Sequence, residues 1–111
     1  MNQISPRGPL GLKVPKLSAA EIREGKEWMR RVKELPCCIC YKHGPSDAHH
    51  VIHGRYGTRK APDKDTIPLC KIHHQDGPEA IHNGKATWME KHGPDYSYLP
   101  WVAAQLGEVD F

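Results

Sequence analysis

The chain has 111 residues and a formal net charge of +3, with ten Gly, ten Pro and one Phe. One domain of this size lies near the lower limit at which a hydrophobic core alone suffices, so a stabilising metal ion is expected. No stretch approaches the roughly 18 apolar residues of a membrane span, and no N-terminal run resembles a secretory signal. We therefore expect a cytoplasmic protein without a membrane partner, whose four Cys are not paired in disulfides.

Positive charge is distributed unevenly along the sequence. Residues 1–33 contain eight Lys or Arg and three Glu, whereas residues 95–111 contain three acidic residues and no basic one. Between these ends, one short segment contains a cluster of basic residues: Arg55, Arg59, Lys60 and Lys64. Such a cluster is typical either of a solvated loop or of a surface that binds a polyanion, and both interpretations stay open for this segment alone.

The N-terminal third predicts an arm followed by a helix. Residues 1–17 contain closely spaced Pro and Gly and predict an extended, flexible basic arm ahead of one domain over residues 18–111. Ser18-Ala19-Ala20-Glu21 is a capping-box pattern, which predicts a helix running to about Leu35, before Pro36.

The rest of the chain predicts two short strands and two further helices, which gives an α+β fold. Strand-forming residues around Val51-Ile52 and Thr66-Ile67 predict a hairpin with a long connecting loop. A helix is predicted over residues 79–92, with Trp88 in the core beside Ile81. A last helix is expected from about residue 100 to 106, ended by Gly107.

Two pairs of residues have the spacing of zinc ligands. Cys37 and Cys40 are separated by two residues, and Cys70 and His73 repeat that spacing thirty residues later. Each pair fits on one tight turn and supplies two ligands, so together they predict a tetrahedral structural zinc site. Cys38 is an alternative partner for Cys40, but a single intervening residue would strain the turn, which favours Cys37.

Additional histidines indicate a second metal site that is chemically open. A four-ligand structural site is complete without His49, His50, His74 and His82. Neighbouring side chains on a strand point to opposite faces, so His49 and His50 are not expected to share one ion. The remaining histidines are expected at the surface or in hydrogen bonds: His43, His53 and His92.

Three segments together carry a resemblance to a known family: Ala48-His49-His50-Val51-Ile52, Lys60-Ala61-Pro62-Asp63 and residues 67–74. They resemble the HNH, or ββα-metal, endonucleases, and more narrowly the Ref-like phage recombination nucleases that act with RecA filaments. The similar region is the motif core over residues 35–92. The resemblance implies a small zinc-stapled ββα-metal domain with an N-terminal helix and a short C-terminal helix. It also implies DNA as substrate, a RecA–DNA filament as partner, and a bacterial or phage-infected cell.

The resemblance also implies a role for each histidine. His49 and His74 would bind one catalytic divalent metal (Mg²⁺, Mn²⁺, Zn²⁺ or Ni²⁺), with His82 as the remaining ligand, and His50 would be the general base. An Asp would orient the base, and Asp63 and Asp65 both stay open for this role. The basic segment, from Arg55 and Arg59 to Lys60 and Lys64, would bind the DNA backbone.

One departure from the family pattern concerns a metal ligand, and two other interpretations of the function stay open. His74 and His82 are eight residues apart with Gly77-Pro78 between them, whereas many family members place this pair four residues apart on one helix. A zinc-dependent nucleic-acid-binding module without catalysis would explain the Cys pairs and the basic segment, but it leaves His49-His50 unused. A small structural protein that binds metal adventitiously is the third interpretation.

Overall fold

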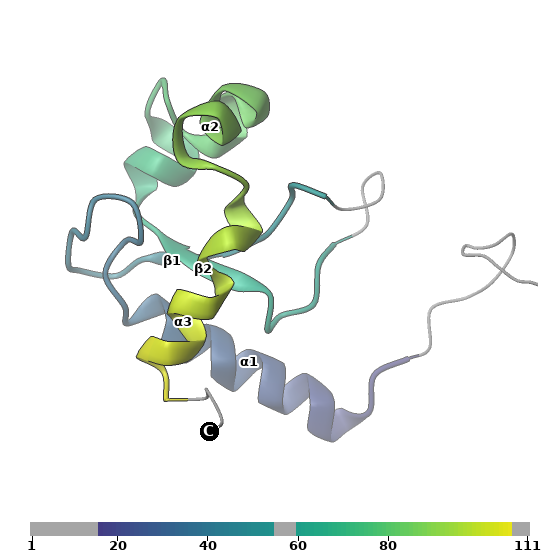
Figure 1. The fold of residues 1–111 in the computed structure, drawn as a ribbon. Coiled ribbons are helices and arrows are strands. Elements are labelled where there is room, and N and C mark those ends of the chain that lie inside the picture. The colour runs from purple at the N-terminus through teal and green to yellow at the C-terminus, as the bar shows by residue number, and fades with distance from the viewer. Residues whose placement is uncertain (1–15, 55–59, 108–111) are drawn as a thin grey trace, which may run out of the picture.

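A two-stranded antiparallel sheet with helices around it forms the centre of the fold (Figure 1). The computed structural model describes residues 16–54 and 60–107. Strand β1 (Asp47–His50) pairs with β2 (Thr66–Leu69), so that Asp47 lies opposite Leu69 and His50 opposite Thr66. The predicted α+β class is therefore confirmed for this part of the chain.

Helix α1 (Ala19–Lys33) begins where the sequence predicts it. The Ser18 side chain accepts a hydrogen bond from the Glu21 amide (3.1 Å), and the Ser18 amide donates to the Glu21 carboxylate (2.8 Å). This reciprocal capping box satisfies two amides that the first helical turn leaves unpaired. Basic residues fill the last turn, where they oppose the negative end of the helix dipole.

The first strand lies earlier than predicted. It was expected around Val51-Ile52, but β1 ends at His50. The Val51 amide still donates across the hairpin to the Asp65 carbonyl (3.1 Å), whereas the Ile52 amide donates to the carboxylate of Asp95 (2.7 Å). A side chain from a distant segment therefore accepts hydrogen bonds from the backbone directly after β1. The second strand includes Thr66-Ile67 as predicted.

The predicted helix over residues 79–92 is broken, and that prediction is wrong in its first turn. A 3₁₀ turn, η2 (Ile81–Asn83), is separated by Gly84 from α2 (Lys85–His92). The Asn83 side-chain amide donates to the carbonyls of Gln75 (2.9 Å) and Gly77 (2.8 Å). These bonds tie η2 to the end of the preceding π-helical turn. The backbone of Gly84 (φ −176°, ψ 79°) is not helical, so η2 does not continue into α2.

The C-terminal half contains two further elements before the last helix. Residues Ile72–Asp76 form a single π-helical turn, η1, directly after β2, and Asp95–Tyr98 form a 3₁₀ turn, η3. Helix α3 (Leu99–Gln105) follows within one residue of its predicted position. Gly107 adopts φ +72°, a left-handed conformation that ends a helix, as predicted.

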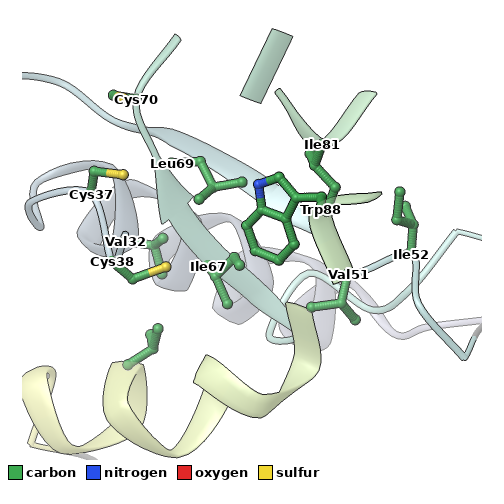
Figure 2. Close-up of a cluster of buried hydrophobic side chains, with 11 residues drawn as sticks. Val32, Cys37, Cys38, Val51, Ile52, Ile67, Leu69, Cys70, Ile81 and Trp88 are labelled. Atoms are coloured by element: carbon green, nitrogen blue, oxygen red, sulfur yellow. The ribbon is translucent and has the colours of Figure 1, made fainter. Parts of the chain in front are cut away.

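The core lies around β2, which packs against α1 and α3 (Figure 2). All four residues of β2 are buried, and Val32 of α1 and Val102 of α3 are fully buried beside it. Trp88 and Ile81 belong to the same buried cluster, which confirms the prediction that Trp88 is a core residue. The core therefore joins elements from both ends of the described chain.

Some predicted features lie outside the described residues. These are residues 1–15 of the predicted basic arm, and Arg55 and Arg59 of the basic segment. Within the described ranges, no helix combines the length and the apolar character needed to cross a membrane.

Candidate metal centres

Cys37, Cys40, Cys70 and His73 form the first candidate metal centre. The Cys40 and Cys70 sulfurs are 3.8 Å apart, and His73 Nδ1 lies 3.3 Å from the Cys70 sulfur and 3.9 Å from that of Cys37. Zinc held at about 2.3 Å from sulfur and about 2.0 Å from nitrogen in a tetrahedron separates its ligand atoms by about 3.3–3.8 Å. The four side chains therefore fit one metal ion in the predicted pairing.

The turn after α1 favours a thiolate at Cys37. The Ile39 amide donates to the Cys37 sulfur (3.4 Å), and the Tyr41 amide donates to the Cys37 carbonyl (2.8 Å). Burial alone would raise the pKa of Cys37, but backbone amides, with that of Cys40 foremost, hold it below its usual value. Cys38 is buried in the core instead, and burial raises its pKa far above that of a free thiol.

Three histidines form the second candidate metal centre. His49 comes from β1, His74 from η1 and His82 from η2, and one ring nitrogen of each lies within 4.8 Å of the others. The Nε2 atoms of His74 and His82 are 3.1 Å apart, although the residues are eight positions apart in sequence. His49 is only 2% exposed, whereas His82 is exposed, so the centre is buried on one side and open on the other.

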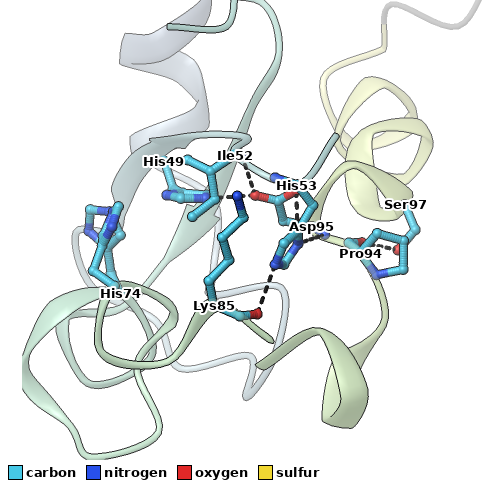
Figure 3. Close-up of polar contacts among 9 residues, drawn as sticks. His49, Ile52, His53, His74, Lys85, Pro94, Asp95 and Ser97 are labelled. Carbon is cyan, nitrogen blue, oxygen red and sulfur yellow. Dashed lines mark hydrogen bonds and ion pairs between the residues drawn. The ribbon is translucent and has the colours of Figure 1, made fainter. Parts of the chain in front are cut away.

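Two carboxylates contact this centre from outside. Asp47 Oδ2 lies 2.8 Å from His74 Nδ1. Asp95 Oδ2 lies 2.9 Å from His49 Nε2 (Figure 3). Asp95 is fully buried, and it also accepts hydrogen bonds from the amides of Ile52 (2.7 Å) and His53 (3.2 Å). Although burial alone would raise the pKa of Asp95, the hydrogen bonds from His49 and the Ile52 amide hold it below its usual value.

Neither carboxylate was predicted from the sequence. Asp47 precedes His49 by two residues on the same strand, so strand periodicity alone would have placed both side chains on one face. Asp95 lies forty-six residues from His49 and follows no recognisable motif. Only the folded chain brings Asp95 to the histidines.

The three histidines predicted to be non-ligands lie outside both clusters. His53 is buried, with Nδ1 accepting a hydrogen bond from the Asp95 amide (2.8 Å) and Nε2 lying 3.0 Å from the Lys85 carbonyl (Figure 3). His92 is half-buried beside Trp88, and His43 is exposed. His53 therefore fills the hydrogen-bonding role that was expected.

His50 faces away from the histidine cluster and contacts Asp63. His50 Nε2 lies 2.8 Å from Asp63 Oδ1, and 19% of the His50 side chain is exposed. Asp65 accepts instead through its backbone carbonyl, from the Val51 amide. Of the two candidates left open by the sequence, Asp63 is thus the residue whose carboxylate contacts His50. If Nε2 donates to Asp63, Nδ1 has the lone pair that can accept a proton.

Gly25 of α1 makes room for Asp63. A methyl group at Gly25 would lie 2.8 Å from Asp63 Cβ and 3.0 Å from its Oδ2, closer than side-chain carbons pack. The missing side chain allows the loop that carries Asp63 to lie directly against the helix. Gly25 thus contributes indirectly to the His50–Asp63 contact, a role with no sequence signal.

The described part of the basic segment lies next to α1. Lys64 Nζ is 5.9 Å from the centre of the Trp28 ring, a cation–π distance, and Lys60 is exposed. The positions of these two lysines place positive charge on the same loop as Asp63.

Fold and clusters together define a small α+β protein with two groups of Cys and His side chains, each of which could hold a metal ion. The family described as "Protein of unknown function (DUF968)" matches residues 3–105, so the chain belongs to the DUF968 family. No curated protein and no solved structure matches the chain.

Proposed function

We propose that this protein is a metal-dependent DNA endonuclease of the HNH class, which hydrolyses phosphodiester bonds. The observation that carries the proposal is that two neighbouring residues of β1 contact different groups. His49 joins the cluster with His74 and His82, whereas His50 contacts Asp63. A ligand and a base held side by side on one rigid strand are the two parts that hydrolysis of a phosphodiester needs.

His50 is the proposed general base. Imidazole is the side chain that most often accepts a proton in enzymes working near neutral pH. Asp63 would fix the ring orientation through Nε2, so that Nδ1 takes the proton from the attacking water. The partial exposure of His50 gives water and substrate access to that nitrogen.

His49, His74 and His82 are the proposed ligands of the catalytic ion, for which Mg²⁺, Mn²⁺, Zn²⁺ and Ni²⁺ are the candidates. When bound, such an ion neutralises phosphate oxygens and stabilises the leaving oxygen. Three protein ligands leave coordination positions for the substrate, as catalytic sites require. Cys37, Cys40, Cys70 and His73 would hold a separate structural zinc.

The resemblance of residues 35–92 to Ref-like nucleases supports a narrower proposal. The protein would act on DNA during phage-related recombination or DNA processing, in the cytoplasm of a bacterial or phage-infected cell. A RecA–DNA filament is the partner that this resemblance suggests. The basic residues of the loop, Lys60 and Lys64 together with Arg55 and Arg59, would bind the phosphate backbone.

A non-catalytic zinc-dependent nucleic-acid-binding module is the competing function. The four-ligand cluster and the basic loop suit both functions equally well. The histidine cluster and the His50–Asp63 contact favour the nuclease, because a binding module has no use for an open metal centre beside an oriented imidazole.

Incubation of the purified protein with supercoiled plasmid tests the proposal. We expect nicked or linear product when Mg²⁺, Mn²⁺ or Ni²⁺ is added, and none when EDTA removes the exchangeable ion. Binding of the plasmid without cleavage under every metal would favour the binding module instead.

Loop lysines are expected to contribute affinity without sequence preference. Lys60→Ala combined with Lys64→Ala should weaken binding to all DNA sequences and lower the slope of log affinity against log salt by about one to two units. Fluorescence anisotropy at several salt concentrations measures this slope. The control, Lys42→Ala with Lys91→Ala, removes equal charge elsewhere on the surface. Equal salt slopes for the loop variant and the parent would mean that the loop does not contact the backbone.

Gly25→Ala is expected to slow cleavage without loss of metal. Alanine favours the helix by about 1 kcal/mol relative to glycine, but its methyl group would displace Asp63 from His50. A general base that loses the contact orienting its ring should reduce the single-turnover rate by about tenfold or more. Gly84→Ala is the matched control, because its methyl group meets Thr87 at an ordinary 3.7 Å. A Gly25→Ala protein that cuts at the parent's rate would show that Asp63 does not orient the base.

A further inference from the structure

We infer that Asp47 and Asp95 are positioning residues, which hold His74 and His49 in opposite tautomers so that different ring nitrogens face one ion. His74 would present Nε2 and His49 would present Nδ1. The inference rests on the proposed function only in its assumption that the histidine cluster binds a divalent ion. The inference adds Asp95 to the site, and Asp95 lies beyond the 35–92 region that resembles known nucleases.

The contacts of His74 fix the first tautomer. Its Nδ1 lies 2.8 Å from Asp47 Oδ2, and its Nε2 lies 3.1 Å from His82 Nε2. An ionised carboxylate can only accept, so the shared proton belongs to His74 Nδ1. Lys71 Nζ lies 3.1 Å from the other Asp47 oxygen and favours the ionised carboxylate. Nε2 of His74 therefore carries the lone pair, and it points to His82.

The contacts of Asp95 fix the second tautomer. Both its carboxylate oxygens accept hydrogen bonds from backbone amides, and these bonds favour the ionised carboxylate, which can only accept. The Asp95 amide in turn donates to His53 Nδ1 (2.8 Å), which fixes this residue from its backbone side. His49 must then carry its proton on Nε2, 2.9 Å from Asp95 Oδ2. Its lone pair is left on Nδ1.

The arrangement matters for metal binding because a protonated ring nitrogen cannot bind a metal. A histidine that is free to exchange tautomers presents an N–H to the ion part of the time. A carboxylate behind the ring removes that state and raises the basicity of the ligand nitrogen, and its loss typically costs 10–100-fold in metal affinity. Both effects change the affinity of the histidine cluster for the metal ion, whether or not DNA is cleaved.

The tautomers can be read directly by imidazole ¹⁵N NMR of protein that contains the structural zinc but no second ion. We expect the Nδ1–H form at His74 and the Nε2–H form at His49. Asp47→Ala should allow His74 to populate the Nε2–H form. Assignment of Nε2–H to His74 in the parent would overturn the inference.

Affinity for Mn²⁺, measured by calorimetry on the zinc-containing protein, provides the second readout. Asp47→Ala and Asp95→Asn should each lower it about 10–100-fold, with the structural zinc retained. Asp76→Asn, an exposed acidic residue at the end of η1, is the control for the loss of one negative charge. Asp95→Asn also weakens bonds to two amides, so its melting temperature is measured alongside. Asp47 is partly exposed, so we expect Asp47→Ala to melt close to the parent, and its melting temperature is measured as well.

The outcomes separate this inference from the proposed function. Weaker Mn²⁺ binding by both variants supports the inference, even if the parent cuts no DNA. Unchanged Mn²⁺ affinity in both variants overturns it, even if the parent is an active nuclease. A parent that binds no Mn²⁺ at the histidine cluster overturns it as well.

Discussion

Cys70→Ala should unfold the protein rather than merely inactivate it. Apparent binding energies of structural zinc in small domains are about 10–16 kcal/mol, whereas native domains are stable by only about 5–15 kcal/mol. The Cys70 sulfur lies 3.8 Å from that of Cys40 and 3.3 Å from His73 Nδ1, so Cys70→Ala would remove one of the four ligands of the tetrahedron. We expect insoluble protein, or a broad melt at low temperature by circular dichroism. Cys40→Ala should behave in the same way.

Cys38→Ala is the matched control for this prediction. Cys38 is a buried neighbour of Cys37 that the structure leaves outside the metal cluster. Its truncation should cost some core packing but leave a cooperative melt and one zinc ion by elemental analysis. If Cys70→Ala melted as cooperatively as the parent, the assignment of the structural zinc site would be wrong.

His50→Ala should lose about a hundredfold or more of the cleavage rate, the usual scale for loss of an acid–base group. His50 lies outside the histidine cluster, so this variant should retain its exchangeable metal and near-native affinity for DNA. His49→Ala and His74→Ala should instead lose that metal while they retain the structural zinc. Metal occupancy and single-turnover cleavage of the three variants measure the difference.

The comparison between variants has two contradicting outcomes. If His50→Ala also emptied the exchangeable site, His50 would be a ligand and the roles of the two β1 histidines would need reassignment. If it still cut at the parent's rate, another group would be the base. His43→Ala is a suitable control, because His43 is exposed and lies outside both clusters.

Features that depend on neighbouring residues were predictable from the sequence. The capping box at Ser18 needs only residues three apart, and the Cys37/Cys40 and Cys70/His73 pairs each occupy one turn. The separation of His49 from His50 follows from strand alternation alone. The contacts in the structure agree with each of these.

Features that depend on distant residues were not predictable. Asp95 accepts from the amides of Ile52 and His53, directly after β1, and also contacts His49, so one buried carboxylate connects the end of the strand to the site. Asn83 ties η2 to carbonyls at the end of η1, which the sequence does not place nearby. Gly25 has a role only because Asp63 folds against it. Each of these features depends on a tertiary contact between residues that are distant in the sequence.

The central claim is that the histidine cluster binds an ion that is used to cut DNA. Its most direct test is the single-turnover cleavage rate of a labelled DNA duplex, measured as Mn²⁺ is added to protein that already contains its structural zinc. We predict that the rate rises with Mn²⁺ and saturates when one ion per chain has bound at His49, His74 and His82. Saturated Mn²⁺ binding without any cleavage would contradict the claim.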